Sequence, residues 1–231
     1  MPDPLTILIT GANRGLGLEL TRQFIDRGHT VLGCARDLDD ASELRALTAN
    51  LHPCDVTDFD SVNALALKLS GKAIDVLINN AGAAPEPGSI EEIDVLDVKH
   101  HLDVNTLGAL RVSKALMTSL RAGSTKLVVH MSSELGSIGL NASGGYYAYR
   151  MGKAALNMMS KTMACEHADE GFQVLAIHPG WVQTRMGGER APLTVEQSCS
   201  GMADVILNAA SDSDRKANGA FLDHTGETLA W

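Results

Sequence analysis

The sequence predicts an α/β fold: a single Rossmann-like domain over residues 1–231, three-layer α/β/α, with a seven-stranded parallel sheet. Three observations support this prediction. Short apolar runs alternate with amphipathic stretches along the whole chain, no Pro- or Ser-rich linker divides it, and a glycine-rich turn follows the first apolar run. Parallel strands need crossover connections, which are usually helices, so this alternation is typical of a doubly wound sheet.

The predicted strands are short apolar runs, namely Leu5–Thr10, Thr30–Ala35, Asn50–Cys54, Ile74–Asn79, Lys126–Met131, Gln173–His178 and Ala220–Asp223. Amphipathic periodicity predicts helices between them, near Gly15–Arg27, Asp39–Thr48, Asp58–Leu69, Ile93–Leu120, Tyr146–His167 and Thr194–Ala210. Loops are expected at 83–88 and 136–145, where Gly, Pro and Ser gather. Both follow predicted strands, at the edge where open α/β sheets bind ligands.

The composition is that of a globular protein, with 45% hydrophobic and 20% charged residues and a net charge of −9. This negative charge argues against a nucleic-acid surface and against a polybasic membrane patch. The four cysteines lack CxxC spacing, so neither a metal site nor a disulfide framework is predicted. The first residues lack the features of a signal peptide, and no apolar stretch reaches the ~20 residues of a membrane span. We therefore expect a cytoplasmic protein.

The first predicted strand runs into Thr10-Gly11-Ala12-Asn13-Arg14-Gly15-Leu16-Gly17, and a helical pattern follows at once. Glycines in such a turn let the backbone approach a phosphate without interference from Cβ atoms. The N-terminus of the next helix offers free N–H groups and a positive dipole to a pyrophosphate. The spacing differs from G-x-G-x-x-G and lacks the Lys-Ser/Thr of a P-loop, which disfavours ATP chemistry. A purely structural turn is the alternative.

Tyr149 and Lys153 stand four residues apart on a predicted helix, which places their side chains next to each other. A tyrosine hydroxyl titrates near pH ~10, and an adjacent ammonium group is expected to lower its pKa toward the range of useful proton exchange. Tyr146 has Arg150 at the same spacing, and this pair is the alternative. The spacing thus predicts a tyrosine that exchanges protons.

Four motifs stand in the order found in short-chain dehydrogenases/reductases, and the chain resembles this family over nearly its whole length. They are Thr10–Gly17, Asn79-Asn80-Ala81-Gly82, Tyr149–Lys153 and Pro179-Gly180. Within the family, residues 144–150 and 179–184 are similar to the C-factor/sniffer-type carbonyl reductases. This order of motifs favours Tyr149 over Tyr146.

The resemblance implies a catalytic set of Asn105, Ser133, Tyr149 and Lys153. Ser133 would bind the substrate carbonyl, and Asn105 would support a water that connects to Lys153. Ser133 stands 16 residues before Tyr149. The family's common spacing is about three residues shorter, so Ser132 stays open as the alternative. A helix kink or an interhelix hydrogen bond is the alternative role of Asn105.

The resemblance also implies NADP(H) as the cofactor. An NAD enzyme commonly has an acidic residue after the second strand, where this chain has Arg36. Pairing of Arg36 with Asp37, and a turn or N-cap role for Asp55, are the alternatives. The implied cofactor-binding residues are Gly11, Asn13, Arg14, Gly15, Leu16, Gly17, Arg36, Asp55, Val56, Asn79, Ala81, Gly82, Tyr149, Lys153, Pro179, Gly180, Val182 and Thr184.

The expected function is NADPH-dependent reduction of a small aldehyde, ketone or dicarbonyl to an alcohol, with Tyr149 as proton donor. Two alternatives use the same residues: an NADP(H)-binding regulatory protein with incidental catalysis, and an alcohol dehydrogenase that works in the oxidative direction. Trp181, Met186, Tyr146 and Tyr147 are candidate walls of the substrate pocket. The resemblance implies a homodimer or homotetramer formed through the two long predicted helices.

Overall fold

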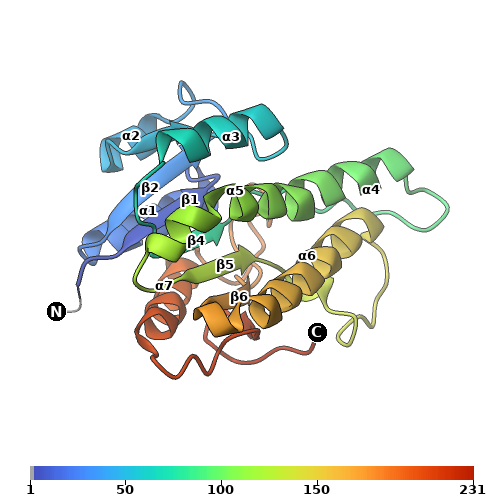
Figure 1. Ribbon diagram of the computed structural model, residues 1–231. Helices are drawn as coiled ribbons and strands as arrows, with labels where there is room; N and C mark the ends of the chain where they lie inside the picture. Colours follow the sequence, from blue (N-terminus) through green and yellow to red (C-terminus); the bar gives the residue numbers. More distant parts are fainter. Residues whose placement is uncertain (1–2) are drawn as a thin grey trace.

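The computed structural model describes residues 3–231. Its seven strands form one parallel sheet in the order β3-β2-β1-β4-β5-β6-β7, with helices on both faces (Figure 1). The predicted fold class is confirmed. Within residues 3–231, no helix combines the length and apolar character that a bilayer crossing requires.

The strands are β1 (Thr6–Thr10), β2 (Thr30–Ala35), β3 (Leu51–Pro53), β4 (Val76–Asn79), β5 (Leu127–Met131), β6 (Gln173–His178) and β7 (Phe221–Asp223). The α-helices are α1 (Gly15–Asp26), α2 (Ser42–Leu47), α3 (Phe59–Lys68), α4 (Val95–Leu102), α5 (Gly108–Ala122), α6 (Tyr147–Glu166) and α7 (Val195–Ser211). A π-helical turn (Asp103–Leu107) joins α4 to α5, and short 3-10 turns cover Glu134–Gly136 and Ala168–Glu170.

Alternate residues of the strands point to opposite faces of the sheet and feed two apolar cores. On one face, Ile7 and Ile9 of β1 pack with apolar side chains of α1, α2 and α7. On the other face, Leu8 of β1 joins apolar side chains of α3, α5 and α6. The strands are apolar on both sides because both sides are covered, as is usual in parallel sheets.

The predicted helix over Ile93–Leu120 is wrong as one regular helix, because the π-helical turn divides it. Two side chains of that turn are drawn into tertiary contacts. Asn105 Oδ1 accepts a hydrogen bond from the Ala83 N–H at 3.0 Å, and Thr106 Oγ1 donates to the Gly152 carbonyl at 2.7 Å. Turns of this kind occur frequently at functional sites.

The other predicted ends differ from the observed ones by a few residues. The largest shift is at α2, predicted from Asp39 and observed from Ser42, because the Asp37 carboxylate accepts the Asp39 N–H and holds a turn there. β4 begins at Val76 instead of Ile74, since its ladder with β1 starts where Ile7 faces Val76.

The chain reverses its direction of travel across the sheet between β1 and β4, which are neighbours although two strands separate them in sequence. At such a switch point the loops that follow the two strands diverge and leave a crevice where ligands bind. The glycine-rich turn follows β1, and the segment Asn80–Gly82 follows β4. The fold therefore brings two of the sequence motifs to the same crevice.

Candidate active site

The Ser133 hydroxyl lies beside the Tyr149 hydroxyl, where it lowers the pKa of the tyrosine. Ser133 caps the 3-10 turn that follows β5, and Tyr149 lies in the first turn of α6. The neighbouring hydroxyl, that of Ser132, instead donates to Asn157 Oδ1. Of the two serines that the sequence leaves open, Ser133 thus faces the tyrosine, and Ser132 is engaged inside the protein.

Lys153 lies one helical turn beyond Tyr149, with Nζ 5.6 Å from the centre of the tyrosine ring. The ammonium group donates a hydrogen bond to the Met131 carbonyl at 2.8 Å, at the end of β5. It also lies against the loop after β4, because a Cβ atom at Gly82 would be 3.7 Å from Nζ. Lys153 therefore reaches from α6 to the ends of two central strands, β4 and β5.

Burial dominates the protonation of this pair. It raises the pKa of Tyr149 to about 12, although the Ser133 hydroxyl lowers it. It also lowers the pKa of Lys153 to about 8. The expected net lowering of the Tyr149 pKa is wrong, because removal of the phenolate from water raises the pKa by more than the neighbouring groups lower it. Tyr149 holds its proton at neutral pH.

Asn105 lies in the π-helical turn and faces the loop after β4. Its carbonyl oxygen binds the Ala83 N–H, while its buried Nδ2 has no hydrogen-bond partner within residues 3–231. A Cβ atom at Gly152, which precedes Lys153, would lie 3.5 Å from Nδ2. The π-helical turn thus places Asn105 beside the lysine-bearing helix.

His101, one turn before Asn105, was not among the predicted site residues. It is buried, with its two ring nitrogens 2.9 Å from the carbonyl oxygens of Asp97 and Ala84. Its ring packs edge-on against Tyr149, with the ring centres 6.2 Å apart. No motif marks this histidine, and its position follows only from the approach of α4 to α6.

The glycine-rich turn after β1 is tied to the Asn79–Gly82 segment. Asn80 Nδ2 donates to the carbonyls of Thr10 and Gly11 at 2.9 and 3.1 Å. The backbone N–H groups of Asn80 and Ala81 both donate to Thr10 Oγ1, at 3.0 and 3.1 Å. Thr10 and Asn80 are therefore positioning residues of the crevice that the sequence analysis missed.

The glycines of this turn have little space for side chains. Gly11 and Gly15 have φ of +65° and +54°, which disfavours other residues. A Cβ atom at Gly17 would lie 2.3 Å from the Gly11 carbonyl oxygen. Arg14, at the N-cap of α1, makes no side-chain capping hydrogen bond, so the first N–H groups of the helix are not occupied by a side chain.

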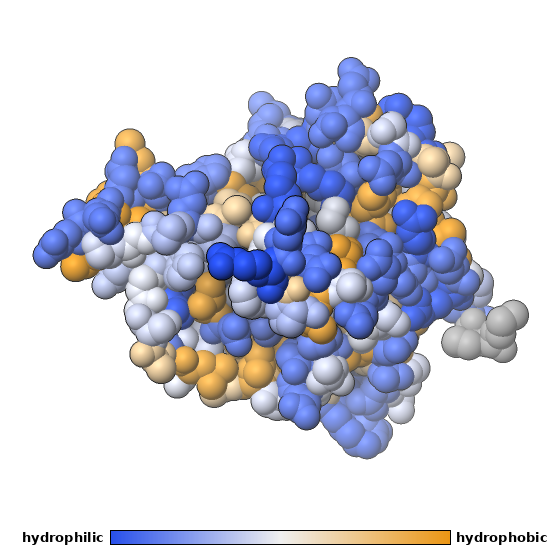
Figure 2. All heavy atoms as spheres, turned by 180° about the vertical axis from the view of Figure 1, so that it is seen from behind, coloured by the Kyte–Doolittle hydropathy of each residue, from blue (hydrophilic) through white to orange (hydrophobic). Residues whose placement is uncertain are grey.

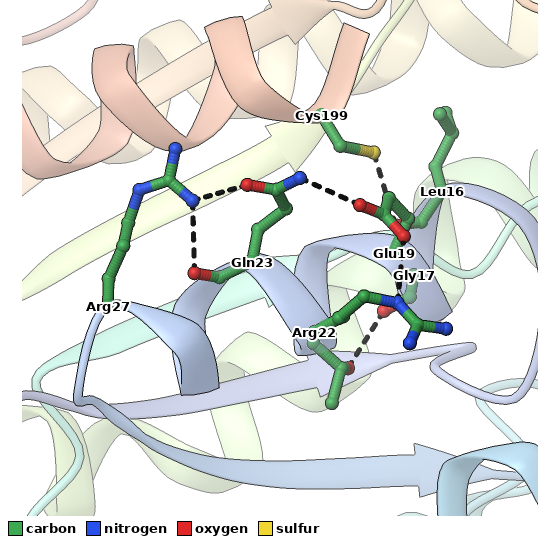
Figure 3. A network of polar contacts seen from close by, with 8 residues as sticks. Leu16, Gly17, Glu19, Arg22, Gln23, Arg27 and Cys199 are labelled. Atoms are coloured by element: carbon green, nitrogen blue, oxygen red, sulfur yellow. Dashed lines mark hydrogen bonds and ion pairs between the residues drawn. The ribbon is translucent and has the colours of Figure 1, made fainter. Parts of the chain in front are cut away.

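A network of polar contacts runs along α1 and reaches α7 at Cys199, as Figure 3 shows. The Cys199 thiol of α7 donates to the Leu16 carbonyl at 3.6 Å, and Gln23 Nε2 donates to Glu19 Oε1 at 2.7 Å. Arg27 continues the network from Gln23 to Asp204 of α7. The network fixes the direction in which the N-terminus of α1 points.

A cavity of about 280 Å³ opens beside the glycine-rich turn. Polar and charged residues line it: Asn13, Arg14, Asp40, Ser42, Glu43 and Arg185. Arg185 lies in the loop after β6 and was not predicted, since no local motif singles it out. The two arginines give the cavity guanidinium groups that can bind a phosphate.

Arg36 and Asp55 end up close together beyond β2 and β3. Burial opposes ionisation of Asp55, but hydrogen bonds from Thr57 and the charge of Arg36 outweigh it and lower the pKa of Asp55. Asp55 Oδ1 accepts both the N–H and the hydroxyl of Thr57, so the turn role left open for Asp55 is observed. Within residues 3–231, Arg36 forms no ion pair with Asp37.

The segment after β6 passes in front of the glycine-rich turn. A Cβ atom at Gly15 would lie 3.9 Å from Thr184 Cγ2. The Thr184 hydroxyl accepts the Gly187 N–H at 3.0 Å, and Gly180 has a φ of +82°. Val182 is buried and bridges to Leu193. The predicted residues Pro179–Thr184 thus border the same crevice as the turn after β1.

Large apolar side chains are exposed on the segments at this end of the molecule. Figure 2 shows orange surface on the projecting end that carries α4, at the left of the view. The exposed side chains include Ile90, Val95 and Leu96 before and in α4, Ile138 and Leu140 after β5, and Trp181 and Met186 after β6.

In the part of the chain that the structure describes, no group of His, Cys, Asp and Glu is arranged to hold a metal ion.

Comparison with known proteins places these features in a family. The model of the family described as short chain dehydrogenase matches residues 5–193. The chain belongs to the short-chain dehydrogenases. C-signal of Myxococcus xanthus is 39% identical over 170 residues, which are 74% of this chain and 100% of that protein.

Two solved structures are similar to this short-chain dehydrogenase over almost the whole chain. The carbonyl reductase Sniffer of D. melanogaster has 31% identity and a TM-score of 0.90, covering 99% of this chain and 100% of its own. The NADPH-bound carbonyl reductase from chicken fatty liver has 32% identity and a TM-score of 0.89, covering 99% of both chains. The resemblance found in the sequence is thereby confirmed.

Proposed function

We propose that this short-chain dehydrogenase is an NADPH-dependent reductase that converts a small aldehyde, ketone or dicarbonyl into an alcohol. The observation that carries the proposal is the buried Tyr149, with the Ser133 hydroxyl beside it and Lys153 one helical turn later. A tyrosine whose pKa is about 12 arrives protonated at neutral pH, as a proton donor for reduction must.

The residues of NADP(H) recognition fit the observed crevice. The close approach of Gly17 to Gly11 and the uncapped N-terminus of α1 suit a pyrophosphate. Arg36 stands where an NAD enzyme commonly has a carboxylate, and Arg14 and Arg185 line the cavity beside the glycine-rich turn. Their positive charges favour a 2′-phosphate. Asp55 and Val56 would border the adenine, while Asn79, Ala81, Gly82, Pro179, Val182 and Thr184 would line the nicotinamide end.

The chemistry that NADPH supplies when bound is hydride transfer. Ser133 donates a hydrogen bond to the substrate oxygen and stabilises the negative charge that develops there. Tyr149 gives its proton to that oxygen, and the Lys153 ammonium stabilises the phenolate left behind. Asn105, whose amide donor is buried near Gly152, helps to return a proton to Lys153.

The test is to follow NADPH oxidation with a panel of aldehydes, ketones and dicarbonyls. Replacing Tyr149 with Phe removes the proton donor, so kcat should fall by about 10²- to 10⁴-fold while the Kd of NADPH stays nearly unchanged. Ser133→Ala should lower kcat strongly and Ser132→Ala much less. Substrate-dependent oxidation that survives in Tyr149→Phe would overturn the assignment of the donor.

A regulatory protein that only binds NADP(H) is the second outcome of this test. It would bind NADPH and turn over no member of the panel. Oxidation of alcohols by NADP⁺ uses the same groups in reverse, and comparing the two directions at equal substrate concentration decides which is faster. An equal Kd for NADH and NADPH would contradict the roles given to Arg14 and Arg36.

We further propose that the protein is a homodimer formed through α5 and α6. A groove of about 550 Å³ lies between these helices, with four methionines among its lining residues: Met117, Met158, Met159 and Met163. Met158 and Leu110 are 69% and 45% exposed, and Lys114 and Glu166 stand at the same groove. A face with apolar side chains and both charge signs is self-complementary under a two-fold axis.

A further inference from the structure

The loop between Ser133 and Tyr149 bridges the two residues proposed to bind and protonate the substrate oxygen. Three successive residues in this loop have left-handed backbone conformations: Gly144, Gly145 and Tyr146, with φ of +67°, +68° and +52°. Glycine adopts this conformation without penalty, whereas a residue with a Cβ atom such as Tyr146 is strained there. Something in the surrounding structure must hold the third residue in place.

Arg150 holds this turn, because its side chain binds the carbonyl oxygens of Gly144 and Gly145 and its backbone N–H binds that of Tyr146. Its Nη2 donates to Gly144 at 3.2 Å, its Nε donates to Gly145 at 3.0 Å, and its backbone N–H donates to Tyr146 at 2.9 Å. The guanidinium group therefore binds the carbonyls of Gly144 and Gly145, while the Tyr146 carbonyl accepts the first backbone hydrogen bond of α6. The planar fork of arginine matches such a set of acceptors, and a lysine ammonium does not.

Arg150 also binds other parts of the same loop. Nη2 donates to Ser143 Oγ at 3.1 Å, and Nη1 donates to the Leu135 carbonyl at 3.4 Å. Leu135 follows closely on Ser133, so the side chain joins both ends of the loop. Tyr146 is thereby not a partner of the Arg150 charge, and the alternative tyrosine–arginine pair considered from the sequence is not formed.

The middle of the loop is fixed from the other side by the last residues of the chain. Ser137 Oγ donates to the Ala230 carbonyl at 2.7 Å, and the Gly139 N–H donates to the Trp231 carbonyl at 2.9 Å. Next to these two attachments, Ile138 is 81% exposed and Leu140 is 48% exposed. The loop is held at both attachments while its apolar side chains face outward.

We propose that Arg150 is a positioning residue that determines substrate affinity by fixing the loop 134–146. This inference rests on the proposed reductase function. Among the residues that the structure describes, the guanidinium group of Arg150 forms hydrogen bonds only with the loop. Arg150 therefore takes no direct part in proton transfer or in cofactor binding. Its loss releases the loop between the substrate-binding serine and the catalytic helix, and leaves Ser133, Tyr149 and Lys153 with their own contacts.

The test is Arg150→Met, with Arg150→Lys as the charge-retaining variant and Arg121→Met as the control. Arg121 is an arginine on α5 whose partner is the exposed Glu170, away from the loop. In both Arg150 variants the KM of a carbonyl substrate should rise about tenfold, as expected for lost hydrogen bonds to a charged group. The kcat, its pH dependence and the Kd of NADPH should stay as in the wild type, and Arg121→Met should change none of them.

Two further measurements keep the proposal separate from a general loss of structure and from the proposed function. Amide hydrogen exchange over residues 137–145 should become faster in Arg150→Met than in the wild type. Added guanidinium ion should lower the raised KM of this variant part of the way toward the wild-type value. Unchanged exchange, a parallel rise in the KM and the NADPH Kd, or a shifted pH profile of kcat would each overturn the proposal. If the wild type reduces no carbonyl, the proposed function fails, and exchange still decides whether Arg150 fixes the loop.

Discussion

Lys153, Tyr149 and His130 lie within a short distance of the end of β5, and all three are buried. Each has a pKa displaced in the direction that favours its neutral form, which is the effect of removing a charge from water. For a proposed reductase this arrangement keeps the acid protonated and leaves the lysine charged over the physiological range. The consequences can be tested by pH.

Reduction should weaken above neutral pH because Lys153 loses its charge. Its pKa of about 8 lies below that of Tyr149, so the ammonium group deprotonates first as the pH rises. The kcat/KM for NADPH, which reports the free enzyme, should therefore be level below pH ~7 and fall through pH ~8. A profile that is level up to pH ~10 would show that the lysine charge is not needed.

His130 should make the fold sensitive to acid. Burial is the larger cause, and the charge of Lys153 the smaller, of a pKa lowered from 6.5 to about 3. Between these values the unfolded chain binds a proton that the folded chain does not, so the free energy of unfolding falls as the pH falls, by about 1.4 kcal/mol per pH unit. Urea unfolding at pH 7 and at pH 5 measures the loss of unfolding free energy in the wild type and in His130→Gln, and the loss should be larger in the wild type. An equal loss in both proteins would contradict the prediction.

At the scale of elements, the shape of the turn between β1 and α1 depends on glycines, because Gly17 lies directly against the backbone of Gly11. In Gly17→Ala the new Cβ atom would meet the Gly11 carbonyl oxygen at 2.3 Å, and backbone has to move to admit it. The Kd of NADPH should rise about tenfold or more, because the turn and the helix N-terminus lose their alignment. Gly88→Ala is the control, since nothing lies within 4 Å of its Cβ position. Equal NADPH binding by both variants, measured by titration calorimetry, would contradict this account.

The seven strands and their parallel arrangement could be predicted from the sequence, because short apolar runs alternate with helical patterns along the chain. β2 and β6 have the predicted bounds, Thr30–Ala35 and Gln173–His178. The π-helical turn could not be predicted, since Asn105 and Thr106 are held by Ala83 and Gly152, which are distant in sequence. A tertiary contact of this kind leaves no periodic signal.

In the proposed site too, some residues could be predicted from local motifs, and others are placed by contacts between segments distant in sequence. Tyr149, Lys153 and the glycines belong to motifs with fixed spacing, and the structure places them at one crevice. His101, Arg185 and the role of Arg150 carry no such spacing, and only the approach of loops and helices discloses them. The predicted direction of the shift in the Tyr149 pKa was wrong, because the spacing predicts the neighbouring charge but not how deeply the tyrosine is buried.

At the scale of the whole molecule, the groove between α5 and α6 leads to a prediction about assembly. Met158→Lys places a charge at a side chain that is 69% exposed in the single chain, so the fold should tolerate it while the proposed dimer should dissociate. Leu67→Lys is the control, because Leu67 is 77% exposed on α3, away from the groove. Light scattering measures the mass. A wild-type monomer, or a Met158→Lys dimer of unchanged stability, would contradict the proposal, and a tetramer would require a second interface.

The chain has two tryptophans, and both stand on segments beside the proposed substrate pocket. Trp181 follows the Pro179-Gly180 segment and donates its indole N–H to the Gly187 carbonyl at 2.7 Å. Trp231 stacks on Phe221 and binds the loop after β5 through its carbonyl group. The intrinsic fluorescence of the protein therefore originates at one end of the sheet. An emission spectrum recorded without any added label reports on the two loops that flank the reacting centre, and hardly at all on the half of the molecule around β2, β3 and α3.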